Sequence, residues 1–186
     1  MNLVLSWNLF IVVVFVVIVA YSFIIGLNRT LKTIIGTYLA ILAADGLGNI
    51  LQEYVFETAN FQKVLETFVN ATVDETLIVA KVIIFISVVV ILSVKGAFDV
   101  HISSGGPAAV PVTGIFGFLN AGLILSTLLV YVSGLSFVQA VAVDTNIVDL
   151  YSGSEFIKGM VDYYNFWFSL PVIGLIIWSL FFNDPE

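Results

Sequence analysis

Five long apolar runs, separated by shorter polar segments, dominate the 186-residue chain. The runs cover residues 3–27, 31–51, 76–94, 113–137 and 166–182. About 20 consecutive apolar residues form a helix that crosses the hydrocarbon core of a bilayer, whereas the strands of a membrane barrel are about 10 residues long and alternate in polarity. The pattern therefore predicts an all-α integral membrane protein, a single transmembrane helical domain over residues 1–186, in which the first four runs are spans.

The first and last runs can each be interpreted in more than one way. The last run, 166–182, is short and contains Pro171 and Gly174. Because proline bends a helix, this run is a short kinked fifth span, a re-entrant hairpin or an interfacial helix, and we favour the fifth span. The first run has an uncharged start and about 25 residues, which is longer than the apolar core of a signal peptide. We therefore interpret it as a retained span.

Composition supports the membrane assignment and excludes several functions. Charged residues make up 10% of the chain and hydrophobic residues 60%, whereas a soluble domain needs about 25% charged residues to cover its surface. The net charge of −7 provides no basic patch for nucleic acid. Cysteine is absent and His101 is the single histidine, so we expect no disulfide, no metal site and no cofactor.

The charges between the runs indicate an orientation. Arg29 and Lys32 lie between the first two runs and form a basic anchor, which places this loop in the cytoplasm because positively charged loops are retained there. The segment from Glu53 to Glu75 is mainly acidic and is expected outside, as is the acidic segment 144–162. The N-terminus is therefore predicted to lie outside, and the C-terminus inside if the fifth run crosses.

Both external segments also contain apolar residues at helical spacing, over residues 54–73 and 151–167. Such spacing predicts short amphipathic helices that lie in the membrane interface or against the bundle. Tyr163, Tyr164 and Trp167 match the aromatic belt found at membrane interfaces. The alternative is that these helices are docking sites for a partner, and we favour the interfacial helices.

Two charges, Asp45 and Lys81, lie inside apolar runs. An ionisable residue at membrane depth is costly and is usually turned inward, paired or functional. Counted from Glu53 and Glu75, the two residues lie about 12 Å and about 9 Å below the surface at about 1.5 Å per residue. We predict an Asp45–Lys81 pair that fixes helix register. The alternatives are separate snorkelling of Lys81 and an ion or proton site on Asp45, although no second acid lies at that depth.

The fourth run begins with a ladder of small residues. Thr113, Gly117 and Ala121 are four residues apart and share one helix face, with Gly114 and Gly122 beside it. Small residues at this spacing let helix backbones approach closely in lipid. We predict packing within the bundle, with homodimerisation through this face as the alternative. Asn120 is expected to hydrogen-bond to another span.

No catalytic constellation is visible. The chain has no P-loop, no Gly-x-Ser-x-Gly motif and no metal-spaced set of histidine and acidic residues. We therefore expect that the protein is not an enzyme.

Three stretches resemble the colicin V production protein (CvpA) family of small multi-span bacterial inner-membrane proteins. They are Gly26-Leu-Asn-Arg29 with the following 31–36, the ladder 113–121, and the segment 152–157. The chain departs from the family pattern at Thr30, where a second glycine is usual, and at Pro111-Val112, where basic residues are usual.

The resemblance implies an accessory or scaffold protein in a bacterial envelope assembly, acting in toxin export or envelope homeostasis. It implies a multi-pass protein of the plasma (inner) membrane whose partners are lipid and either other membrane subunits or a second copy. The alternative, from a different class, is an ion- or proton-translocating transport subunit that uses Asp45.

Overall fold

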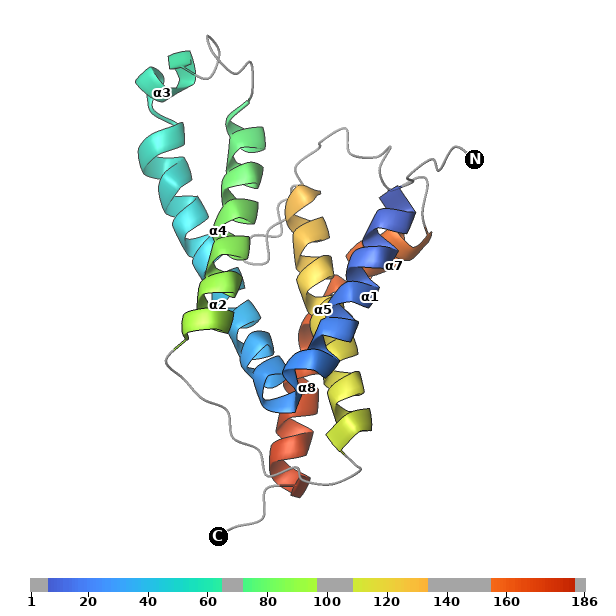
Figure 1. Ribbon diagram of the computed structural model, residues 1–186. Coiled ribbons are helices and arrows are strands. Elements are labelled where there is room, and N and C mark those ends of the chain that lie inside the picture. The colour runs from blue at the N-terminus through green and yellow to red at the C-terminus, as the bar shows by residue number, and fades with distance from the viewer. Residues whose placement is uncertain (1–6, 65–71, 97–108, 134–154, 183–186) are drawn as a thin grey trace.

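A computed structural model of the chain is built from helices (Figure 1). It describes residues 7–64, 72–96, 109–133 and 155–182. In chain order the helices are α1 (Trp7–Ile25), α2 (Leu27–Leu51), the π-helical turn η1 (Gln52–Phe56), α3 (Ala59–Val64), α4 (Val73–Lys95), α5 (Ala109–Val132), α7 (Glu155–Asp162) and α8 (Tyr164–Phe182). Within the described ranges there is no strand, in agreement with the predicted all-α class.

Local sequence determines where several helices begin. A single residue, Gly26, reverses the chain between α1 and α2, and its φ of 79° is a conformation that glycine adopts without strain. Thr72 and Glu75 form a capping box at the start of α4, in which each side chain bonds the other residue's backbone N–H. Pro111 lies in the first turn of α5, where its missing N–H costs no helical hydrogen bond.

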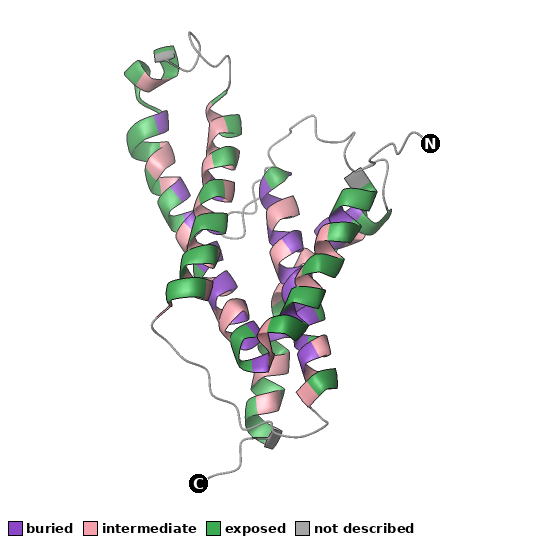
Figure 2. Cartoon of the chain, in the orientation of Figure 1, coloured by how far each residue is buried: buried purple, intermediate pink, exposed green. Residues whose placement is uncertain are grey.

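The central helix is α5, which contacts α1, α2, α4, α7 and α8. α2 and α4 form an antiparallel pair, and in Figure 1 this pair diverges from α1 and α5 toward the end that carries α3. Buried positions follow the inward faces of the helices (Figure 2). The largest cluster combines residues of α2, α4 and α5, among them Leu31, Ile34, Phe85, Leu123 and Tyr131.

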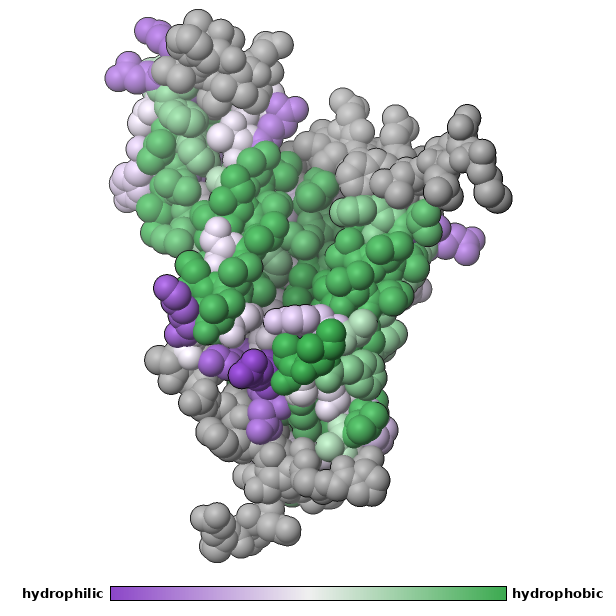
Figure 3. Space-filling view, in the orientation of Figure 1, coloured by the Kyte–Doolittle hydropathy of each residue, from purple (hydrophilic) through white to green (hydrophobic). Residues whose placement is uncertain are grey.

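Four helical segments are long and apolar enough to cross a membrane: Asn8–Ile25, Leu27–Phe56, Val73–Lys95 and Ala109–Val132. The visible face of the molecule is largely apolar over these helices (Figure 3). α7 and α8 meet at 65° and count as a further crossing if the bent pair is one span. The four predicted spans are therefore confirmed as helices of sufficient length.

Helix boundaries differ from the predicted ones in an orderly way. α2 begins at Leu27 rather than at residue 31 and continues through η1 to Phe56, while α5 begins at Ala109 rather than at residue 113. The residues added to α2 include the polar Asn28 and Arg29, which the first turn of a helix accommodates, so the apolar run underestimates the length of α2. The residues added at the start of α5, 109–112, are apolar. Residues 134–137 of the fourth predicted span lie outside the described residues.

The two amphipathic segments have different outcomes. The predicted helix over 54–73 is broken, because η1 continues α2 to Phe56 and the short α3 starts again at Ala59, and residues 65–71 lie outside the described part of the chain. In the second segment α7 is amphipathic, with Ile157, Met160 and Val161 buried. α7 packs on α5 and α1, so it covers one end of the bundle.

Candidate functional site

The two charges inside the apolar runs meet in the structure. The Lys81 ammonium donates a hydrogen bond to Oδ1 of Asp45 over 3.1 Å, and this contact is also an ion pair. The side chain of Lys81 is 7% exposed and that of Asp45 is 1% exposed. The predicted juxtaposition is therefore correct, and separate snorkelling of Lys81 is not what the structure shows.

Helical periodicity explains how α2 presents Asp45 to α4. Ile41, Ala44, Asp45 and Gly48 are all buried, and positions three and four residues apart lie on one helix face. The buried residues of α4 are Lys81 and Phe85, which are again four apart. The pair therefore lies at the contact between the inward faces of two antiparallel helices.

Gly48 makes room for the lysine. A Cβ atom built on Gly48 would lie 2.7 Å from Cγ and 2.8 Å from Cε of Lys81. The aliphatic stem of Lys81 thus crosses the bare backbone of α2 one turn beyond Asp45 before its ammonium reaches the carboxylate. The ion pair requires both the two charges and the glycine.

Tyr131 of α5 brings a third helix to the pair. Its hydroxyl donates to the carbonyl oxygen of Ile41 over 3.2 Å, and its ring meets Phe85 edge-on at 6.0 Å between centroids. Tyr131 is buried and interacts electrostatically with Asp45. A buried polar group formed by α2, α4 and α5 therefore replaces the isolated pair expected from the sequence.

The arrangement is that of a neutralised pair. A buried charge is tolerated when a well-placed opposite charge compensates its lost hydration, and the geometry this requires locks the two helices in one register. No group of three or more His, Cys, Asp or Glu side chains that could hold a metal occurs in the described part of the chain.

Gly48→Ala is expected to weaken the bundle by about 1–3 kcal/mol, the usual cost of inserting a methyl group into a packed site, because the methyl displaces the Lys81 stem. Gly46→Ala is the matched control, since Gly46 is exposed and a Cβ there meets nothing within 4 Å. Unfolding free energies in mixed detergent micelles compare the two. Equal stability of the variants would mean that Lys81 does not cross Gly48.

The small-residue ladder of α5 contacts other helices of the same chain. A Cβ on Gly117 would lie 2.7 Å from Cβ of Ser22, so α1 and α5 approach closely there. Gly114 faces the ring of Phe23 in the same interface. Gly122 lies under the ring of Trp167, which joins α8 to α5. Thr113 and Ala121 are buried, and this matches the predicted packing within the bundle.

Asn120 does not match its prediction in full. It is 2% exposed, yet its Oδ1 has no hydrogen-bond partner among the described residues. Two buried hydroxyls bond within their own helices: Ser22 donates to the carbonyl oxygen of Ile18 and Thr127 to that of Leu123, each one turn earlier. The expected bond from Asn120 to another span is thus absent at Oδ1 among the described residues and stays a prediction for the amide group as a whole.

The basic anchor has a structural partner at the same end of the α2–α4 pair. Lys32 donates to the carbonyl oxygen of Gly96 over 2.7 Å and so ties the start of α2 to the end of α4. A cation at a helix C-terminus also interacts favourably with the helix dipole. Arg29 is exposed at the same end.

Several interhelical contacts were not predicted. The Tyr38 hydroxyl of α2 donates to the carbonyl oxygen of Phe168 in α8, three residues before Pro171. Ser126 of α5 donates to the carbonyl oxygen of Met160 over 2.8 Å. The sequence does show hydroxyl side chains inside apolar runs, which need hydrogen-bond partners. Which residues they bond cannot be predicted from the sequence, because it depends on how the helices are arranged.

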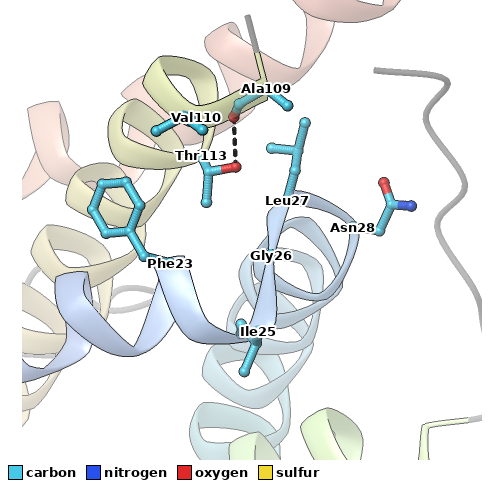
Figure 4. Close-up of a pocket in the computed structure, with 8 residues that line it drawn as sticks. All are labelled: Phe23, Ile25, Gly26, Leu27, Asn28, Ala109, Val110 and Thr113. Carbon is cyan, nitrogen blue, oxygen red and sulfur yellow. Dashed lines mark hydrogen bonds between the residues drawn. The ribbon is translucent and has the colours of Figure 1, made fainter. Parts of the chain in front are cut away.

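A cavity of about 380 Å³ lies at the turn between α1 and α2 (Figure 4). Phe23, Gly26 and Asn28 line one side and Val110 and Thr113 the other. The Thr113 hydroxyl donates to the carbonyl oxygen of Ala109 in its own helix. Among the described residues no charged side chain lines this cavity, so the polar group around Asp45 remains the stronger candidate site.

No family model, curated protein or solved structure matches this chain.

Proposed function

We propose that this chain is a multi-pass protein of a bacterial plasma membrane that acts as an accessory or scaffold subunit of an envelope assembly, as its resemblance to the CvpA family implies. Four helical segments of sufficient length and apolar character support a membrane location. The bent pair α7–α8 supplies a fifth crossing, which is consistent with the start of α1 and the end of α8 lying at opposite ends of the helical bundle (Figure 1).

The distribution of charge supports an N-terminus outside the cell. Arg29 and Lys32 begin α2 and Lys95 ends α4, so these basic residues share one end of the antiparallel pair. Glu53 and Asp74 lie at the opposite end. Basic segments are retained on the cytoplasmic side, so the end with Arg29, Lys32 and Lys95 is the cytoplasmic one.

One observation carries the scaffold proposal: the buried charges serve to join helices. Lys81 contacts Asp45 through its ammonium and Gly48 through its stem. The remaining length of α4 is largely exposed and apolar, as at Val79, Ile83 and Val90. A rigid hairpin with an apolar outer face suits a subunit that sits among lipids and other membrane helices.

The second candidate function is transport of an ion or proton, and the observation that favours it is Tyr131. Its hydroxyl bonds the carbonyl oxygen of Ile41, four residues before Asp45 on α2, so α5 adds an ionisable side chain beside the Asp45–Lys81 pair inside the apolar region. Intramembrane ionisable groups in contact are typical of proton relays. In this alternative Asp45 exchanges the proton or binds the cation.

The double variant Asp45→Asn with Lys81→Met separates the two functions, because it removes both charges while avoiding an uncompensated one. A scaffold is expected to keep a stoichiometric membrane partner when the intact variant is purified from its native membrane in mild detergent. A transporter is expected to lose ion or proton flux in vesicles. Lys95→Met, which removes an exposed cation from α4, is the control.

Measurements on the wild-type chain distinguish the scaffold function from the transport function. Purification without a stoichiometric partner, together with flux that the purified chain supports alone and the double variant lacks, would overturn the scaffold proposal. A partner that is retained by the wild type, the double variant and the control alike, with no flux from any of them, would overturn the transport alternative.

A further inference from the structure

The elbow where α7 meets α8 forms an open cavity of about 500 Å³. Its lining is almost entirely apolar and consists largely of four aromatic residues and a methionine, with Glu155 among the lining residues: Phe156, Tyr163, Phe166, Trp167, Met160 and Glu155. The helices bend by 65° at this point, and the bend turns the side chains of both helices toward one space. The cavity is distinct from the Asp45 group and from the cavity at Gly26.

Its lining is suited to an organic cation. The faces of aromatic rings carry partial negative charge and attract ammonium groups, and aromatic cages are a recurring means of binding alkylated ammonium ions. Glu155 adds a formal negative charge at the edge of the same cavity. Apolar walls would strip the hydration shell of a metal ion without replacing it, so a cation that carries its own carbon atoms fits better.

The inner wall is held in place by neighbouring helices. Trp167 lies on Gly122 of α5 and packs against Phe118, with 5.6 Å between ring centroids. Phe156 meets Phe15 of α1 edge-on at 5.9 Å. The backbone of Met160 accepts the hydroxyl of Ser126. A wall fixed by α1 and α5 is largely formed before any ligand arrives, which lowers the entropic cost of binding.

The position of the elbow identifies the source of the cation. α7 buries one face against the bundle and exposes Glu155, Lys158 and Asp162 on the other, the pattern of a helix lying in a membrane interface. Aromatic residues such as Tyr163 concentrate at the depth of lipid headgroups. Lys158 follows Glu155 by three residues, so a cation and an anion are neighbours on this exposed face.

We propose that this elbow binds the headgroup of a zwitterionic phospholipid. The ammonium enters the aromatic cavity beside Glu155, and Lys158 faces the phosphate that precedes the ammonium in the headgroup. The ligand comes from the bilayer itself, and its acyl chains lie along the exposed apolar side of α8.

The test uses the full-length protein, loaded in detergent with an equal mixture of phosphatidylethanolamine, phosphatidylcholine and phosphatidylglycerol of identical acyl chains. Native mass spectrometry then measures which lipids are retained. We expect roughly a two- to tenfold enrichment of the zwitterionic lipids over phosphatidylglycerol, the range that partly exposed cation–aromatic contacts provide. Glu155→Gln and Phe166→Leu should each reduce this enrichment, and Lys158→Gln should weaken retention of all the phospholipids.

Matched controls keep the result specific. Asp162→Asn removes a negative charge from the same helix without touching the cavity, and Tyr21→Leu removes an exposed aromatic side chain from α1. Both should behave like the wild type. Equal retention of all three lipids by the wild type, or an equal loss in Asp162→Asn and Glu155→Gln, would overturn the site. Displacement of the bound lipid by soluble phosphoethanolamine at similar concentration would overturn the lipid as its source.

Discussion

Replacing Lys81 with methionine is expected to destabilise the folded bundle by about 3–5 kcal/mol, the usual cost of removing one partner from a buried ion pair. The physical reason is that Asp45, which is 1% exposed, stays buried after its cation has gone. Methionine keeps much of the lysine stem over Gly48, so the loss reports the missing charge rather than a cavity.

Asp45→Asn is expected to cost less than Lys81→Met. The long lysine side chain can move its ammonium toward the headgroups when its carboxylate is absent, while an aspartate cannot reach that far. Joining both substitutions in one chain should recover most of the stability lost by Lys81→Met. The energy by which the double variant departs from the sum of the single variants measures the coupling of the pair.

Reversible unfolding in mixed detergent micelles measures all three variants, with Lys95→Met as the control for loss of a cation from α4. Lys95 is exposed at the end of the same helix, so its replacement should leave stability nearly unchanged. Strictly additive single effects, or a Lys81→Met variant as stable as Lys95→Met, would show that the pair does not hold α2 to α4.

The Asp45–Lys81 contact could be predicted because it depends mainly on the depth of each residue in its span, which follows from its position in the sequence. Both helices are long, they are consecutive spans joined at one end, and a rise of about 1.5 Å per residue converts sequence position into depth. The high cost of an isolated charge in lipid made pairing the favoured outcome. Depth, topology and energetic cost therefore led to one contact without any knowledge of side-chain packing.

The contact of Tyr131 with α2 could not be predicted by the same reasoning. Tyr131 lies on a helix that is not a sequence neighbour of α2, and its approach to Ile41 depends on how α5 rotates about its own axis. Apolar composition all around the spans leaves this rotation undetermined, because lipid and protein neighbours favour the same residue types. The role of Gly48 was hidden for the same reason, since a glycine beside a buried charge does not reveal which atom fills its space.

The small-residue ladder of α5 could be predicted in part. The spacing of Thr113, Gly117 and Ala121 predicted a close helix contact but allowed either a neighbour in the same chain or a second copy. In the structure α1 covers this face at Ser22, so Gly117 serves a contact within the chain. Gly122 faces another helix, α8. The small residues of α5 therefore contact two different helices, and no feature of the sequence predicts which residue contacts which helix.

Gly122→Ala is expected to destabilise the bundle, because its new methyl group would overlap the ring of Trp167. An indole ring is rigid, so it must swing away or α8 must move, and overpacking of this kind costs about 1–3 kcal/mol. α8 should then separate partly from α5, and unfolding in micelles would report the loss of stability.

Gly174→Ala is the matched control, since a Cβ on this glycine of α8 meets Phe116 at 3.4 Å, an ordinary contact distance. Both changes gain the same helix propensity, up to about 1 kcal/mol, so the difference between them isolates the overlap with the ring. Trp167→Leu in the Gly122→Ala background should restore stability by removing the ring. If Gly122→Ala is as stable as Gly174→Ala, Trp167 does not lie on α5. The inner wall of the elbow cavity would then lose its support, so one variant tests both the docking of α8 and the preformed shape of the lipid site.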